Sequence, residues 1–501
     1  MTVMALNSPF SLSQLRLLLA LLSLLLSAFA LLTDDIINSD GILYMQMAEA
    51  FMQGGLAAMA ALYDWPFFAL LVAAISHLSG LHPETSVAIL NVLLFVIFTD
   101  ALLLIARQLL PDMRQLIIAA LLILLFYSIN DYRDFIIRDI GYWAFISIAL
   151  QQFLSYLKNS HWQQALLWQV SGLIALLFRV EGIIILLLMP LFLLFSQQSK
   201  PLLKSLLQLY SLLLIAGLIA IITLIAGVGW TDAFGKLGSI VLYLDFAGFQ
   251  SRFTANSLII AEQILHPVAD DEAGQVLFFG LIGMLAMQLL LGLSAAYLLI
   301  LLLSRKTQVP WFNTPLNKAI AWFLLINIGI LTVFCLHQYF VTTRYCVMAF
   351  VAIFLLVLPR LTAFIDDIWV QRKTGLQVLV ALLLIYSLGD VIYQSSSKTY
   401  IPETAKWATE QLPAGKKLLT TDAFLAYYVD KYADDNSDIT QQPTLKNYQQ
   451  FDYLLTVEKR RNQTLKKQLA ELPLEAVFSR ENNRGNKATV YRILPPADSR
   501  N

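Results

Sequence analysis

Apolar runs long enough to cross a bilayer recur along most of the first 393 of the chain's 501 residues. A transmembrane helix needs about 20 mostly apolar residues. Charged residues such as Arg138, Lys158, Arg179 and Arg305 bound several runs, as expected because a charge at mid-bilayer is costly. The runs that predict such helices lie at roughly 12–32, 86–107, 115–129, 140–157, 165–178, 181–195, 204–228, 274–303, 319–338, 345–359 and 375–393.

The run 66–80 is shorter and reaches only about 22 Å at 1.5 Å per residue, so it predicts a partial or re-entrant helix. The basic residues support this, because Lys and Arg concentrate in cytoplasmic loops. If the N-terminus is cytoplasmic and 66–80 does not cross, the basic loops around Arg107, Lys158, Arg305 and Arg360 all lie inside. The segments 33–65, 130–139, 229–273 and the C-terminal region then lie outside.

The composition changes after residue 393. The last 108 residues hold 16 Lys/Arg and 13 Asp/Glu, although the whole chain is only 14% charged, against about 25% in soluble domains. Helices are predicted at 401–412 and 462–469, and strands at 417–421, 453–457, 476–479 and 488–493. The predicted fold is an all-α polytopic membrane domain of about 11–13 helices (1–393, with external loop 33–65) and a small extracytoplasmic α/β domain (394–501).

Several function classes find no support. The net charge is zero and no basic stripe interleaves with aromatic residues, which argues against nucleic-acid binding. The two cysteines lie in apolar runs, and the five histidines show no metal-ligand spacing. A glycine-rich fingerprint for a nucleotide is also missing from the sequence.

The external loop 33–65 contains Asp34, Asp35, Asp40, Glu49 and Asp64 but no Lys or Arg. A solvated loop that follows the topology rules would look similar. More specific is the order of features after the acids: Asp40-Gly-Ile-Leu-Tyr44, then Gly54-Gly55, then Asp64-Trp65-Pro66 before an apolar helix. Its middle, 42–62, has helical spacing and predicts one or two short helices at the membrane surface.

This order resembles the C-type (GT-C) membrane glycosyltransferases, in particular the protein O-mannosyltransferase and lipid A aminoarabinose transferase superfamily. Their first external loop reads Asp-Glu-x-x-Tyr, then Ala, Gly and Pro. Here Gly41 replaces the second acid and Pro66 alone remains of a frequent Pro-Pro pair. The resemblance implies that Asp40 is the catalytic base, and it implies inversion at the anomeric carbon.

Three further groups of charged residues precede or follow predicted spans. Asp139 follows Arg138 and precedes an aromatic-rich span, where the family has an Asp, so it is the second predicted catalytic residue. Arg179 with Glu181, and Arg344 with Tyr345, also match turns where the family carries basic residues. Structural ion pairs or interfacial anchors are equally open readings. The predicted substrate-binding residues are Tyr44, Asp35, Arg138, Arg179, Glu181, Arg252, Arg344 and Tyr345.

The resulting hypothesis is an inner-membrane enzyme, with a periplasmic active-site loop and C-terminal domain. It would move a sugar from a polyprenyl-phosphate carrier to a hydroxyl of a lipid, glycan or protein. A carboxylate would remove the hydroxyl proton, and cationic groups would stabilise the leaving phosphate. The sequence names no cofactor, and the resemblance leaves a divalent cation open, because some relatives bind one and others do not; Asp40 and Asp139 would be its ligands. A transporter or flippase, and a non-catalytic membrane scaffold, are the alternatives.

Overall fold

The computed structural model describes residues 11–196, 201–225, 245–309, 314–393, 397–433, 439–442, 444–445 and 447–495. It divides into two compact units. One is Met1–Phe29 with Met47–Ile392, and the other is Ala30–Gln46 with Tyr393–Asn501. The sequence had assigned the whole of loop 33–65 to the membrane domain, whereas residues up to Gln46 group with the C-terminal unit.

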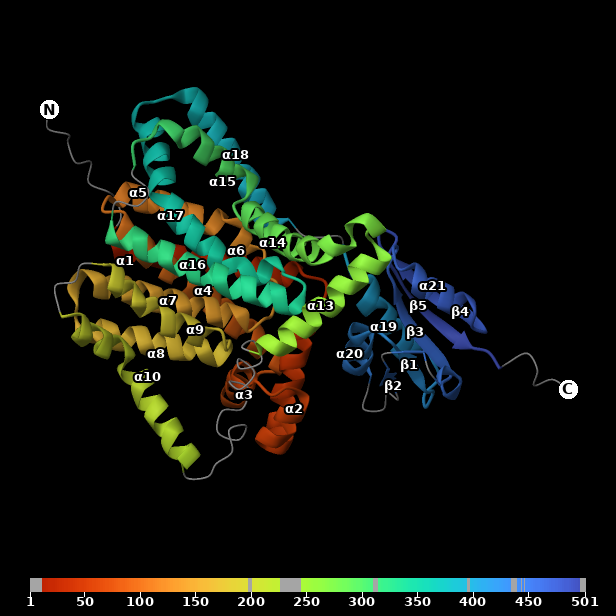
Figure 1. Cartoon of the computed structure of the whole chain (residues 1–501). Helices are drawn as coiled ribbons and strands as arrows, with labels where there is room; N and C mark the ends of the chain where they lie inside the picture. Colours follow the sequence, from red (N-terminus) through yellow and green to blue (C-terminus); the bar gives the residue numbers. More distant parts are fainter. Residues whose placement is uncertain are drawn as a thin grey trace. The chain divides into compact units, whose positions relative to one another are not determined.

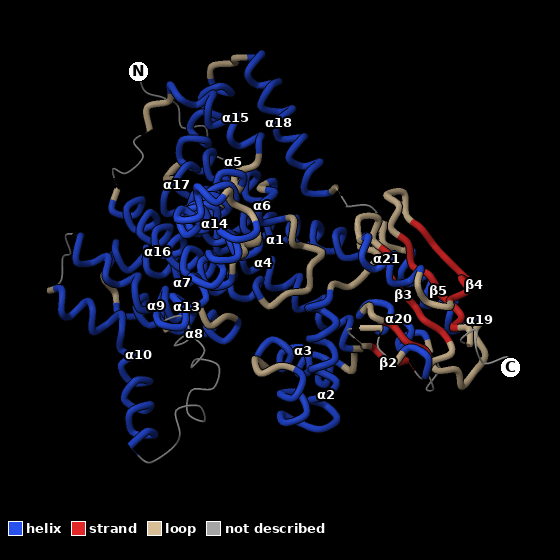
Figure 2. The backbone as a smooth tube through the Cα atoms, turned by 45° about the vertical axis from the view of Figure 1, so that its right-hand side comes forward, coloured by secondary structure: helices blue, strands red, loops and turns tan. Residues whose placement is uncertain are grey.

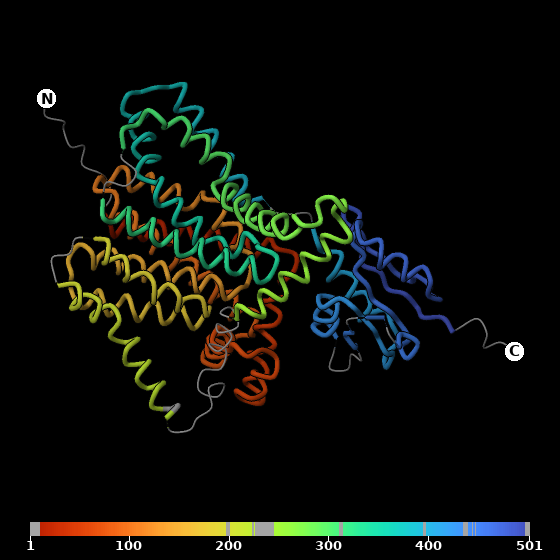
Figure 3. Tube along the Cα trace, viewed as in Figure 1, coloured from red at the N-terminus to blue at the C-terminus, as the bar shows by residue number. Residues whose placement is uncertain are grey.

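The first unit is built from helices (Figures 1 and 3). Eight helices of the described chain are long and apolar enough to cross a membrane, and four shorter apolar helices accompany them. The protein is therefore a multi-pass membrane protein. Its helices are α1 Leu12–Thr33, α2 Ser39–Leu62, α3 Phe67–Ser79, α4 Pro83–Leu109, α5 Met113–Leu125, α6 Tyr127–Asn130, α7 Asp139–Asn159, α8 Trp162–Phe178, α9 Gly182–Leu188, η1 Met189–Phe195, α10 Leu202–Ile225, α13 Phe246–Gln263, η3 Pro267–Glu272, α14 Ala273–Leu291, α15 Ala295–Leu303, η4 Ser304–Lys306, α16 Pro315–Gln338, α17 Thr343–Val370 and α18 Thr374–Ile392.

The predicted helix 274–303 is broken in the structure, because α14 ends at Leu291 and α15 begins at Ala295. The break lies at Gly292, where a Cβ atom would overlap the ring of Phe350 in α17. Ser128 donates a hydrogen bond to the carbonyl of the same glycine. This close approach depends on helix packing, so the sequence pattern of the segment alone did not reveal it.

Two other predicted helices have different bounds in the structure. The run 115–129 forms α5 and, after Phe126, the single turn α6; the Phe126 ring stacks on Phe354 of α17 at 4.8 Å. The run 345–359 continues as α17 to Val370, with Pro359 inside the helix. The short helix α3 was expected: its 13 residues span about 20 Å, less than a hydrocarbon core of about 30 Å. The predicted end of 204–228 and the start of loop 229–273 lie outside the described residues.

Some contacts join segments with the same predicted side of the membrane. Lys158 Nζ donates to the Gln108 carbonyl at 2.9 Å, and Arg360 Nη2 donates to the Arg305 carbonyl at 3.0 Å. These are loops predicted to be cytoplasmic. Residues of loops predicted to be external meet one another too, since the Tyr132 and Thr343 hydroxyls are 2.7 Å apart.

Helix α2 covers the part of the first loop that was predicted to be helical. It is kinked at Gly55, whose φ of 70° and ψ of −162° are not helical. A positive φ of this kind is costly for any residue with a Cβ atom, so the Gly54-Gly55 pair allows the chain to change direction here. The prediction of one or two short helices in this loop is confirmed.

The second unit contains a five-stranded mixed sheet (Figure 2). The strand order is β2-β1-β3-β5-β4, in which β1 pairs in parallel with β2 and β3, while β5 pairs antiparallel with β3 and β4. The predicted α/β domain is confirmed, although α20 and β2 were not predicted. Its elements are α19 Tyr400–Gln411, β1 Leu418–Thr420, α20 Ala423–Tyr432, β2 Ile439–Gln441, η5 Tyr448–Gln450, β3 Tyr453–Glu458, α21 Gln463–Ala470, β4 Leu474–Glu481 and β5 Lys487–Ile493.

The two faces of this sheet bury different helices because side chains alternate along a strand. Leu418 belongs to a core with residues of α19 and α20, such as Ala405 and Leu425. Its neighbour Leu419 belongs to a second core with Leu469 of α21. The sheet is thus covered on both faces.

The chain segment that follows α1 is part of this unit. Ile36 is 6% exposed and belongs to the α19–α20 core. The Ile37 amide donates to the Tyr428 hydroxyl at 3.0 Å. The Asp35 carboxylate accepts a hydrogen bond from the Lys398 amide at 2.7 Å. Residues 30–46 are therefore anchored by both apolar burial and polar contacts.

We predict that Ile36→Ala destabilises the C-terminal unit by roughly 2–5 kcal/mol, because it leaves a cavity in a buried apolar core. Hydrogen exchange of the β3 and β5 amides in the full-length protein measures the effect. The control Leu32→Ala changes a side chain that is 85% exposed and should leave exchange unchanged. Equal exchange in the two variants would show that Ile36 is not part of the core.

Candidate active site

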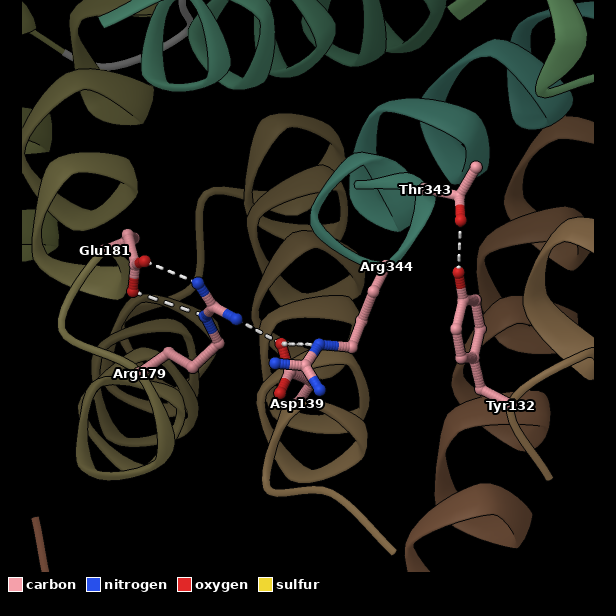
Figure 4. A network of polar contacts seen from close by, with 6 residues as sticks. All are labelled: Tyr132, Asp139, Arg179, Glu181, Thr343 and Arg344. Carbon is pink, nitrogen blue, oxygen red and sulfur yellow. Dashed lines mark hydrogen bonds and ion pairs between the residues drawn. The ribbon is translucent and has the colours of Figure 1, made fainter. Parts of the chain in front are cut away.

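A buried carboxylate lies at the start of α7. The Asp139 residue is 2% exposed. Its Oδ1 atom accepts a hydrogen bond from Arg179 Nη1 and lies 3.9 Å from Arg344 Nε (Figure 4). These three residues come from the start of α7, the turn after α8 and the start of α17, and the sequence had nominated all three.

Arg179 holds two carboxylates at once. Besides Asp139, its guanidinium donates to both oxygens of Glu181, at 3.3 and 2.6 Å (Figure 4). Burial acts to lower the pKa of Arg179, but the two carboxylates outweigh it and raise that pKa well above its usual value. Burial likewise acts to raise the pKa of Glu181, yet Arg179 and, more weakly, Arg138 keep it below its usual value. Arg179 and Glu181 therefore remain charged at neutral pH.

A glycine brings α7 close to the turn that carries Arg179. A Cβ atom at Gly141 would overlap the ring of Phe178, the residue before Arg179. Phe178 also stacks on Phe145 and meets Phe67 edge to face, at ring distances of 5.9 and 5.0 Å. This packed aromatic cluster fixes the turn so that Arg179 reaches Asp139.

The site also contains the N-terminal ends of two long helices. Asp139 begins α7, while Thr343 and Arg344 begin α17. The N-terminus of a helix carries about half a positive charge and attracts anions. The Tyr345 ring lies beneath both guanidinium groups, 4.8 Å from Arg179 and 5.3 Å from Arg344. The arrangement is rich in positive charge and has one aromatic wall.

Arg133 supports the loop before α7, a role that the sequence did not suggest. It is 2% exposed and donates from Nη1 to the hydroxyl groups of Ser23 and Ser27 in α1, and from Nε to Asn130 at 2.7 Å. Burial lowers the pKa of Arg133 to about 9, so the group remains a cation at neutral pH. Its hydroxyl partners in α1 fix the loop 131–138 and with it the start of α7.

Two other nominated arginines have different surroundings. The Arg138 guanidinium lies over the Tyr63 ring at 5.3 Å. Arg252 is exposed on α13, where it donates to the Gly248 carbonyl at 3.3 Å and lies 3.5 Å from His337 Nδ1. Arg138 thus borders the Asp139–Arg179–Glu181 network, whereas Arg252 contacts other residues.

The nominated residues of the first loop belong to the second unit. Asp40 lies in the first turn of α2, and Tyr44, one turn later, is 5% exposed. Asp35 uses Oδ2 to hold the Lys398 amide, which gives this residue a structural role in the unit.

A divalent cation does not fit beside Asp139 as it stands, because guanidinium groups already occupy the space around its carboxylate. Within the described residues, no group of three His, Cys, Asp or Glu side chains could hold a metal ion.

Comparisons with known proteins show limited similarity. No protein-family model and no curated protein matches the sequence. Two cryo-EM structures of the arabinofuranosyltransferase AftD from mycobacteria, one of them of a point mutant, resemble the fold, with TM-scores of 0.48 and 0.47 and identities of 10% and 12%. Each similarity covers 98% of this chain and 40% or 42% of the AftD chain, so this chain spans about two fifths of that protein's length.

We predict that Arg179→Met destabilises the protein by about 3–5 kcal/mol, because it leaves the buried Asp139 carboxylate without its contacting cation. Thermal unfolding in nanodiscs measures the change. Arg492 pairs with Glu475 at 3.6 Å where both side chains are 54% exposed, so the control Arg492→Met should cost less than about 1 kcal/mol.

Adding Asp139→Asn to Arg179→Met removes the uncompensated charge and should restore part of the lost stability. A loss in Arg179→Met no larger than that in Arg492→Met would contradict the account of a buried, mutually dependent ion pair.

Proposed function

We propose that the protein is a membrane glycosyltransferase that moves a sugar from a polyprenyl-phosphate carrier to an acceptor hydroxyl outside the cytoplasm. The observation that carries the proposal is the cluster of Arg179, Arg344 and Arg138 around two carboxylates, at the starts of α7 and α17. These guanidinium groups bring positive charge to two helix N-termini, and the charge of Arg138 also acts on Glu181. Such a site, at the predicted external end of a helical membrane domain, suits a phosphate whose lipid tail remains in the bilayer.

Arg344 is the arginine that we assign to the phosphate. Arg179 is committed to two carboxylates, and its side chain is 12% exposed. The Arg344 side chain is 26% exposed, and its Nε is 3.9 Å from Asp139, at the outer limit of an ion pair. Arg344 is therefore the more accessible of the two guanidinium groups to a phosphate. A guanidinium binds phosphate through two parallel hydrogen bonds, which fixes the orientation of the leaving group as well as its charge.

Asp139 acts through the arginines in this proposal and is a positioning residue. The sequence had given it a catalytic role, but a buried carboxylate that contacts one guanidinium and lies near a second is poorly placed to take a proton. Its negative charge holds Arg179 in place and aligns Arg344. Glu181 also helps to hold Arg179 in place, because it forms a second ion pair with the same guanidinium.

Asp40 is the proposed general base. It occupies the position of the catalytic acid in the resemblance, in the first turn of α2, with Tyr44 one turn later. The acceptor oxygen would attack the anomeric carbon while its proton passes to Asp40. The bond between the anomeric carbon and the phosphate oxygen would break at the same time. The phosphate would leave with the bonding electrons, and Arg344 would stabilise its charge.

The proposed location follows from the same topology. The charge pattern of the sequence assigns the basic loops to the cytoplasm and assigns the loops that carry the arginine cluster to the other side. We therefore place the protein in a bacterial inner membrane, with the site and the C-terminal domain in the periplasm.

We predict that Asp40→Asn lowers the rate of sugar transfer by about 10²–10⁴-fold, the usual contribution of a general base. Purified protein in nanodiscs, given a panel of polyprenyl-phosphate-linked hexoses and pentoses, provides the assay. Donor affinity should change little, because the phosphate contacts remain. The matched control is Asp34→Asn, which changes a neighbouring acid with no counterpart in the resemblance.

An Asp40→Asn protein that retains full transfer activity would refute the assignment of the base. Uptake of a lipid or solute into proteoliposomes, with no transfer from any donor in the panel, would favour the transporter alternative.

A further inference from the structure

The C-terminal unit contains a cavity of about 320 Å³ between the first turns of α2, helix α20 and the edge strand β2. Polar side chains reach it from all three elements: Ser39 and Gln46 from α2, Tyr427 and Asp430 from α20, and Gln441 from β2. The apolar side chains of Ile42, Leu43 and Ile439 also line it. Segments almost 400 residues apart in the sequence thus form one concave surface.

Two residues just before α2, Ile36 and Ile37, fix the position of α2 against α20. Ile36 is buried in the core that includes Leu425 and Val429 of α20. The Ile37 amide donates to Tyr428, the neighbour of the cavity residue Tyr427. The Tyr427 and Tyr428 rings meet edge to face at 5.2 Å, which restrains the Tyr427 ring. These contacts fix the chain before α2 and the Tyr427 ring, and α2 and Tyr427 form two sides of the cavity.

The lining chemistry defines the kind of ligand. It offers two hydroxyl groups, two primary amides and one carboxylate, and none of the lining residues is Lys, Arg or His. Among the described residues that line the cavity, a phosphate or a sugar acid would meet no cation and would be repelled by Asp430. A neutral molecule with many hydroxyl groups suits the lining, because amides donate and accept hydrogen bonds and a carboxylate accepts them from hydroxyl groups.

The shape and size of the cavity also favour a neutral sugar. The volume lies at the lower end of small-molecule sites, which measure about 300–1,000 Å³. An aromatic ring and aliphatic side chains beside the polar groups match a sugar ring, whose C–H faces are apolar and whose edges carry hydroxyls. A cavity of this size accommodates one or two sugar units.

We propose that this cavity binds a neutral oligosaccharide that is the acceptor substrate, which rests on the proposed glycosyltransferase function. Ser39 immediately precedes Asp40 in the first turn of α2, so a glycan held here would present its next unit near the residue assigned as base. The C-terminal unit would then select the acceptor, whereas the arginine cluster of the membrane unit would hold the donor phosphate.

Binding is tested with full-length protein in nanodiscs, because detergents with sugar headgroups would compete for the cavity. Saturation-transfer NMR and calorimetry would use mannotriose, maltotriose and chitotriose as probes, with trigalacturonate and a Ser/Thr-rich peptide as comparisons. At least one neutral trisaccharide should bind. The double variant Gln441→Ala/Asp430→Asn should weaken that binding at least tenfold, through the loss of hydrogen bonds at an exposed site.

The matched control is Gln468→Ala/Glu471→Gln, which makes equivalent changes near the end of α21, away from the cavity lining. It should bind the trisaccharide as the unmodified protein does. Absence of binding by all three neutral trisaccharides, unchanged binding in the cavity variant, or preference for trigalacturonate or the peptide would each overturn the proposal.

The same experiment separates this inference from the proposed function. A protein that binds a trisaccharide in this cavity but transfers no sugar would refute the glycosyltransferase function and the acceptor role, and leave a glycan-binding site. A protein that transfers sugar without trisaccharide binding in the cavity would refute the cavity alone.

Discussion

The ion pair between Asp139 and Arg179 is the interaction on which the external end of the helical unit depends. A carboxylate with 2% exposure needs a cation in contact, since a buried and unpaired charge costs several kcal/mol. Gly141 gives α7 the close approach that this contact requires. Arg133 fixes the preceding loop to α1, and the hydrogen bond from Tyr132 to Thr343 joins it to α17. Four helices or helix ends are therefore positioned around one buried charge pair.

That organisation has a consequence for binding. Because Arg179 is held by two carboxylates, it sets the geometry of its neighbours and is poorly available to a ligand. Arg344 shares Asp139 at a longer distance and is more exposed. In the proposed function Arg179 therefore keeps its place when a phosphate binds, and Arg344 is the arginine that contacts the phosphate. Charges that are already in position stabilise a developing charge with little reorganisation.

In the second unit, different residues of the first loop have different roles. Asp35, Ile36 and Ile37 anchor the chain to the C-terminal domain. The residues that follow, Ser39 to Gln46, contribute one wall of a cavity. The acidic residues of this loop therefore have different roles. Asp35 accepts a hydrogen bond from a backbone amide, whereas Asp40 is the proposed catalytic base.

Much of the architecture could be predicted because bilayer thickness and loop charge constrain sequence directly. The apolar runs, the short helix at 67–79 and the strands at 453–458 and 487–493 needed only local patterns. The break at Gly292 could not be predicted, since the close approach of the Phe350 ring to this glycine involves another helix. Strand β2 is three residues long and carries almost no pattern of its own.

The candidate site was predictable in its members but not in its pairings. Asp139, Arg179, Glu181 and Arg344 were each nominated from their places at helix ends. The pair of Arg179 with Glu181 is local and was among the open readings. The contact of Arg179 with Asp139 depends on packing between residues 40 positions apart. Arg133 was missed as a site residue because nothing local distinguishes a buried arginine held by serines of α1 from a solvated one.

The most direct test of this account is a cryo-EM structure of the protein in nanodiscs with a short-chain polyprenyl phosphate. We predict that the phosphate lies within hydrogen-bonding distance of Arg344, with Arg179 still in contact with Asp139. A phosphate bound away from Arg344, or one that takes Arg179 from Asp139, would contradict the account.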